Sequence, residues 1–341
     1  MTRSRSVVLL SSLVVVAGTL AAMGFLYLSP ARAAVGPLPA EGLVLPADTR
    51  FVVGIDVRRL VQSELYAKNA GRASLRPEAF AELESRTGLN PERDVDQVVI
   101  AGGPSAGMGP HGAGIVLVSG RFDRYKLSRA LETTHKDVTW KDHHGTTVYL
   151  YGEGRKGAGA AAFLDDDTLV LGSQAAVEET VATKSRGSAP LRTNAPLMAL
   201  LGRLKPGSTF WMVGDQSLLA NLPKSIPAPG GDGGSLQLPA VRTLLVTGDL
   251  DPQVALDITA DTVDDAAAKN LADMLRGLAA LAALHGDTKP DLKELASGIN
   301  VTTEASQVHV SARIPHALFE SLRPKKTAEA PGAGGPPSVA R

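Results

Sequence analysis

The sequence contains no cysteine, few aromatic residues and no excess of charge of either sign. The missing cysteines exclude disulfides, thiol catalysis, thiolate metal sites and an N-terminal lipid anchored through cysteine. Aromatic residues make up 4% of the chain, so stacking on bases or sugar rings is not expected to dominate binding. With 35 basic and 35 acidic residues the formal net charge is zero, and we predict no nucleic-acid partner.

What is present is typical of a folded protein. Apolar residues account for 44% of the 341 residues and charged residues for 21%. This length is sufficient for one large or two medium domains. The frequent use of Ala, Gly and Arg resembles that of a high-GC bacterium.

The first 34 residues predict export. Arg3 and Arg5 precede residues 7–28, a stretch of 22 residues without a charge. This length favours a retained membrane anchor, whereas the A-x-A pattern that ends at Ala33 favours a signal peptide cleaved after it. In both cases we expect the body of the protein in the periplasm or another extracytoplasmic compartment. The membrane is a partner through residues 7–28 if the anchor is retained.

One stretch of the chain occurs twice. Residues 45–60 and residues 204–219 each contain a Pro-bearing turn, a short apolar strand that opens with Phe, an Asp and the start of a helix. Two later pieces recur in the same order: a strand pair followed by a helix, and a hairpin followed by a helix. We therefore predict one repeat over residues 43–185 and a second over residues 195–322.

The strands are predicted as hairpins separated by helices, not as single strands alternating with helices. This pattern favours an α+β fold with antiparallel sheets and helices packed on one face, over a doubly wound parallel sheet. The Pro- and Gly-rich segment 323–341 predicts a disordered tail.

Three pieces of sequence resemble a family of exported bacterial proteins that carry a domain of unknown function. They are Leu45–Thr49 (LPADT), Thr87–Val95 (TGLNPERDV) and Asp167–Ser173 (DTLVLGS). The resemblance covers most of residues 43–322 and rests on structural motifs. It implies export, and it brings no activity and no site residues.

Asp142, His143 and His144 form a cluster of side chains that bind Zn²⁺ in other proteins. Adjacent residues of a strand point to opposite faces, so the two imidazoles diverge there. In a hairpin turn both rings are solvated. We therefore predict no metal site here, since stable sites need three or four convergent ligands, and we expect no cofactor.

Residues 107–112 match the G-x-G-x-x-G pattern of dinucleotide-binding loops. A strand is predicted after this loop, where pyrophosphate binding requires a helix. We interpret the segment as a hairpin loop inserted in the first repeat. Its residues Gly107, Met108, Gly109 and His111 are candidates for contact with a partner.

Asp56 and Asp215 occupy equivalent positions in the two repeats. A symmetric pair of acids is one interpretation. The simpler one is that each Asp caps the helix that follows its strand.

Together these observations predict an exported envelope protein that is a non-enzymatic binding or scaffold module with a protein or hydrophobic ligand as partner. No catalytic residue is assigned. Two alternatives remain open: a metal-dependent hydrolase that uses Asp142, His143 and His144, and a carrier of a hydrophobic ligand between sheet and helices.

Overall fold

The fold is seen in a computed structural model of the chain. The structure describes residues 38, 40–69, 77–103, 114–134, 137–152, 158–205, 207–216, 225–227, 235–237, 239–284 and 290–321. The candidate anchor at residues 7–28, the cleavage site near Ala33 and the tail at 323–341 lie outside these residues.

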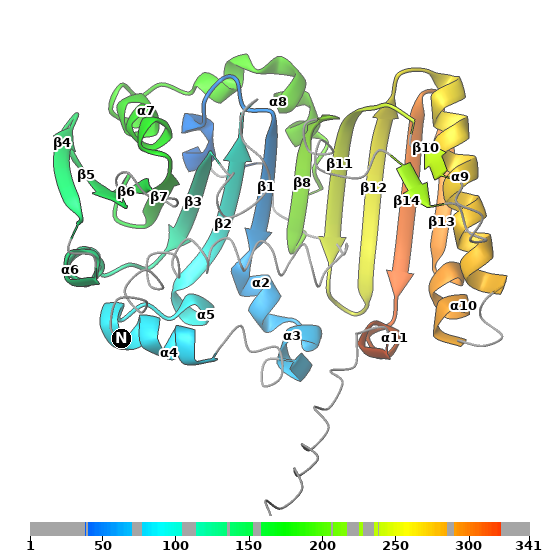
Figure 1. Cartoon of the computed structure of the whole chain (residues 1–341), viewed down its shortest axis with the longest axis horizontal. Helices are drawn as coiled ribbons and strands as arrows, with labels where there is room; N and C mark the ends of the chain where they lie inside the picture. Colours follow the sequence, from blue (N-terminus) through cyan, green and yellow to red (C-terminus); the bar gives the residue numbers. More distant parts are fainter. Residues whose placement is uncertain are drawn as a thin grey trace, which may run out of the picture.

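A 12-stranded sheet organises the described part of the chain, and all of its strand pairs are antiparallel. Figure 1 shows it running across the whole molecule. In spatial order its strands are β13 (Ile299–Glu304), β14 (Gln307–Ile314), β12 (Val254–Thr262), β11 (Val241–Asp249), β8 (Phe210–Asp215), β1 (Phe51–Asp56), β2 (Val95–Gly102), β3 (Ile115–Gly120), β7 (Thr168–Gly172), β6 (Gly159–Phe163), β5 (Thr146–Tyr151) and β4 (Thr139–His143). A separate two-stranded sheet is formed by β9 (Ser225–Pro227) and β10 (Ser235–Gln237).

The two repeats meet where β1 pairs with β8. Val53 lies opposite Met212, and these are the third residues of the two strands. Phe51 pairs with Gly214, and Ile55 pairs with Phe210, so the register is the same when read from either strand. The pairing therefore has local two-fold symmetry.

The strand order is mirrored about this pair. Outwards from β1 come β2, β3, β7 and β6, and outwards from β8 come β11, β12, β14 and β13. Both β2 and β11 shift register at their first residues, next to β3 and β12 respectively. This mirrored order is the one that the predicted internal duplication requires. The hairpin of β4 and β5 extends the sheet at the edge of the first repeat only.

The helices lie on both faces of the sheet. Their bounds are η1 (Ala40–Val44), α2 (Val57–Gln62), α3 (Glu64–Asn69), α4 (Pro77–Thr87), α5 (Pro91–Asp94), α6 (Arg124–Thr134), α7 (Gln174–Ser185), η2 (Pro190–Thr193), α8 (Ala195–Gly202), α9 (Asp265–Leu284), α10 (Pro290–Ser297) and α11 (His316–Ser321). In the first repeat, Lys141 of β4 forms an ion pair of 2.8 Å with Glu178 of α7. Tyr149 of β5 donates to Ser128 of α6 at 2.9 Å. Because Lys141 pairs with Val148, and Val148 and Tyr149 point to opposite faces, α7 and α6 lie on opposite sides.

The second repeat has the same division. Asp261 of β12 forms an ion pair with Arg203, which follows α8, while the neighbouring Ala260 packs in a cluster with Ala268 and Ala272 of α9. The residues paired across the sheet show that α7 and α8 share one face and that α6 and α9 share the other. Figure 1 shows α7 near β4–β7 at one end and α9 beside β13 at the other.

The predicted α+β class with an antiparallel sheet is confirmed. Helices were expected on one face of the sheet, and the structure has helices on both faces. The reason lies in the central strands, because β3 and β7 each bury four consecutive residues and so bury apolar side chains on both faces. A strand of this kind needs packing partners above and below the sheet.

Polar caps define where several helices start. Asp56 accepts a hydrogen bond from the backbone N of Arg59 and caps α2, as the capping interpretation predicts. Asp215 forms an ion pair of 2.9 Å with Arg50, and the helix expected after it lies outside the described residues. The single helix expected after β1 is divided at Ser63, whose hydroxyl accepts from the N of Tyr66 in α3 at 3.1 Å.

The centre of the sheet supplies a test of the strand pairing. A Cβ atom at Gly54 would lie 2.2 Å from Cε2 of Trp211, which is 1% exposed. We expect Gly54→Ala to lower the free energy of unfolding by about 1–3 kcal/mol, because the core there is already full. Urea denaturation measures the change.

The matched control is Gly277→Ala in α9, where a Cβ meets nothing within 4 Å. This change should raise the free energy of unfolding by about 0.5–1 kcal/mol, since alanine favours a helix more than glycine does. Equal stability of Gly54→Ala and the unchanged protein would contradict the packing described here.

Candidate functional site

The sequence-predicted histidine cluster lies at the tip of the hairpin of β4 and β5. His143 ends β4, and His144 and Gly145 form the turn with φ angles of 53° and 78°. Two consecutive positive angles are typical of a type I′ hairpin turn. Asp142 accepts from the N of Gly145 at 3.2 Å, and the two imidazole rings stand edge to face with centroids 4.7 Å apart. The carboxylate of Asp142 thus stabilises the backbone of the turn.

The candidate partner loop of the first repeat falls outside the described residues. Gly107, Met108, Gly109 and His111 belong to the undescribed segment 104–113 between β2 and β3. Within the described ranges, no helix is both long enough and apolar enough to cross a bilayer.

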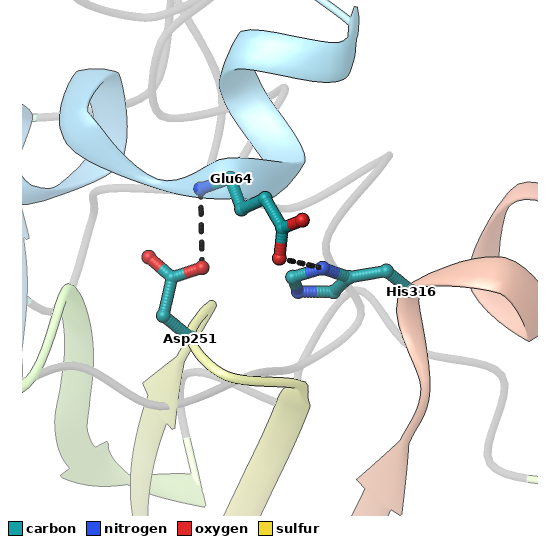
Figure 2. A group of neighbouring side chains, drawn as sticks. All are labelled: Glu64, Asp251 and His316. Atoms are coloured by element: carbon teal, nitrogen blue, oxygen red, sulfur yellow. Dashed lines mark hydrogen bonds and ion pairs between the residues drawn. The ribbon is translucent and has the colours of Figure 1, made fainter.

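A different group of three side chains meets where the two repeats join, and we call it the junction cluster. It consists of Glu64, Asp251 and His316 (Figure 2). Glu64 is the first residue of α3, Asp251 follows β11 in the turn to β12, and His316 is the first residue of α11. One potential ligand atom from each residue lies within 4.8 Å of the other two. The first repeat supplies one of these groups and the second repeat supplies the other two.

Hydrogen bonds hold each member of the junction cluster in place. The Nε2 atom of His316 lies 2.5 Å from the carbonyl oxygen of Leu250, and its Nδ1 atom lies 3.5 Å from Oε2 of Glu64. The backbone N of Glu64 donates to Asp251 at 3.1 Å. His316 is buried, with 7% of its surface exposed, whereas both carboxylates are exposed. The imidazole ring is therefore held in the protein interior, and the two carboxylates lie beside it at the surface.

The pKa of the Glu64 carboxyl is lowered, first by its hydrogen bond and charge interaction with Lys68 and to a smaller degree by His316. The Nζ atom of Lys68 lies 2.7 Å from Oε1 of Glu64, one helical turn further along α3. Lys68 thus engages one carboxylate oxygen while the other faces His316.

Sequence reasoning missed the junction cluster. Glu64 and Asp251 are 187 residues apart, and no spacing motif connects them. The strand that leads to Asp251 and the strand that leads to His316 were both predicted, but their neighbouring ends follow from the pairing of β12 with β14. Only a correct sheet order brings the three residues together.

A second feature is the polar face, which we define as seven polar side chains of β12, β13 and β14 that point away from α9. Two pairs dominate it: Arg313 donates to Asp257 at 3.0 Å, and Thr259 lies 3.2 Å from Nδ1 of His309. Its remaining members are Ser311, Asn300 and Thr302. Asn300 and Thr302 are exposed, and the other five are partly exposed.

The same face of the first repeat is apolar. It carries Leu117, Val170 and Ala162, which are buried, and α7 packs on it. The helix that follows β14 in the second repeat is α11, which spans 6 residues against the 12 of α7. α11 lies at the end of the sheet next to α10, so it does not occupy the place that α7 has in the first repeat.

Comparisons with known proteins add little to this geometry. No protein-family profile and no curated protein matches the chain. A solved structure titled "Structure of crystal form I of TP0453" is similar at a TM-score of 0.40 and 9% identity, over 85% of this chain and 96% of that chain. A likeness of this size carries no argument about function.

The environment of Glu64 gives a testable prediction. Replacing Lys68 with Met should raise the pKa of the Glu64 carboxyl, because the cation that favours its ionised form is removed. A carboxyl with a lowered pKa contributes stability above its ordinary pKa, and that stability is lost as the pH falls through the lowered value. Lys68→Met should therefore be less sensitive to acid over this interval.

NMR titration of the Glu64 carboxyl measures the shift directly. Lys269→Met is the control, because Lys269 is an exposed lysine of α9 in the other repeat. It should leave the pKa of Glu64 unchanged. An unaltered titration of Glu64 in Lys68→Met would contradict the assignment.

Proposed function

We propose that the chain is an exported protein of the bacterial cell envelope whose folded body is a non-enzymatic binding or scaffold module. The observation that carries this proposal is the polar face. On this side of the sheet the helix α7 covers the first repeat, whereas the second repeat presents polar side chains.

The polar face offers hydrogen-bonding and charged groups that another protein can contact. It combines an acid, a base, an imidazole, an amide and hydroxyl groups on three adjacent strands. Four of its side chains are already held in two pairs on neighbouring strands, so binding requires little ordering of those four. The ion pair of Arg313 and Asp257 holds the long guanidinium flat against the sheet, where it also donates to the carbonyl of Leu256 at 3.0 Å.

The export part of the proposal rests on Arg3, Arg5 and the uncharged segment 7–28. Reporter fusions after residue 60 test it. A reporter that is active only outside the cytoplasm should be active, and one that is active only inside should be silent. The opposite pattern would contradict export. Mass analysis of the purified protein separates the two forms, because a new N-terminus at Ala34 means a cleaved signal.

The binding part is tested by photo-crosslinking in the cells that produce the protein. A photoreactive residue at Thr302 on the polar face should give a discrete adduct with a protein partner. The control position is Tyr125 of α6, which is 71% exposed and lies on the helix that covers the opposite face. Adducts of the same mass from both positions, or none from Thr302, would contradict the assignment of the face.

A further inference from the structure

The junction cluster carries an inference that is independent of the polar face. We propose that Glu64, Asp251 and His316 bind one Zn²⁺ ion, which ties the first repeat to the second. The three ligands are one imidazole nitrogen and two carboxylate oxygens, a combination that Zn²⁺ accepts. The two negative charges balance the charge of the ion.

The spacing of the ligand atoms suits a small ion. Nδ1 of His316 and Oε2 of Glu64 are 3.5 Å apart. Two ligands at about 2.1 Å from a tetrahedral ion are separated by roughly 3.4 Å. The remaining separations are no more than 4.8 Å, and Asp251 is exposed, so rotation of its side chain is sufficient to complete the site.

Each ligand is already oriented by a second group, as in established metal sites. The carbonyl oxygen of Leu250 engages Nε2 of His316 and leaves Nδ1 facing the two acids. The backbone N of Glu64 holds the carboxylate of Asp251. Lys68 holds Oε1 of Glu64 and leaves Oε2 toward the ring. The ligands are therefore held close to their binding positions before any ion arrives, and rotation of the Asp251 side chain completes the site.

The electrostatics of the cluster call for a positive charge at its centre. Nε2 of His316 donates to the carbonyl oxygen of Leu250, so Nδ1 is the ring nitrogen that faces the carboxylate of Glu64. The second carboxylate, from Asp251, adds a third ligand that a proton does not use.

The ligand set selects Zn²⁺ over Mg²⁺ and Ca²⁺. Both of those ions prefer oxygen ligands only and larger coordination numbers. Imidazole favours the later transition metals, and three protein ligands leave a fourth position for water. We assign the ion a structural role, because its ligands come from segments that are far apart in the chain.

The test uses the full-length chain, purified in detergent without a histidine tag and stripped of metal. Titration with Zn²⁺ should show one tight site per chain, and the melting temperature should rise by about 5 °C at a hundredfold excess over the dissociation constant. Mg²⁺ at the same concentration should have no effect. Glu64→Gln and Asp251→Asn should each weaken Zn²⁺ binding at least tenfold.

The control variant carries His143→Gln and His144→Asn, which remove the imidazoles of the β4–β5 turn and should leave Zn²⁺ binding unchanged. The two junction variants alter exposed side chains, and their melting temperatures without metal show that they fold. Absence of a Zn²⁺ effect on the unchanged protein would overturn the proposal and leave a simple ion pair. Binding that is lost in the control variant and kept in the junction variants would also overturn it.

Discussion

The pairing of β1 with β8 is the interaction on which the rest of this structure depends. These two strands are the only bridge within the described sheet between the two repeats, and the register places equivalent residues opposite one another. Hydrogen bonds just beyond each strand repeat the symmetry: Asp56 donates from its backbone N to Thr209, and Asp215 donates to Arg50. Because both strands are buried and six residues long, the two sheets become one continuous surface with a single main core.

The repeats share a topology but differ in the helices that cover them. The proposed binding surface is the polar face, which lacks the helix that α7 provides in the first repeat. The first repeat buries both faces of its strands, with α7 on one side and α6 on the other. The second repeat alternates along β14, so that Val308, Ala312 and Ile314 are buried and the residues between them are less so. This alternation is typical of an antiparallel strand with one face packed and the other accessible to solvent.

The sequence predicts much of this architecture because its signals are local. The predicted strand pair followed by a helix is found as β2, β3 and α6 in the first repeat and as β11, β12 and α9 in the second. Strand β4 was not predicted, since Trp140, Lys141 and Asp142 lack the apolar alternation of a packed strand, and β4 is held only at an edge. The junction cluster was beyond sequence reasoning for another reason. Its residues meet only when two repeats are docked, and docking is decided by the register of β1 on β8.

The symmetry of that register has a consequence for how two such halves can assemble. A strand that pairs with its own equivalent residue for residue has the geometry of an isologous dimer interface. Two separate chains, each of half the present length, would close the same ladder by a two-fold rotation. A single polypeptide does not require its two halves to be identical. One half carries the β4–β5 hairpin and the covering helix α7, whereas the other has a sheet face of polar side chains.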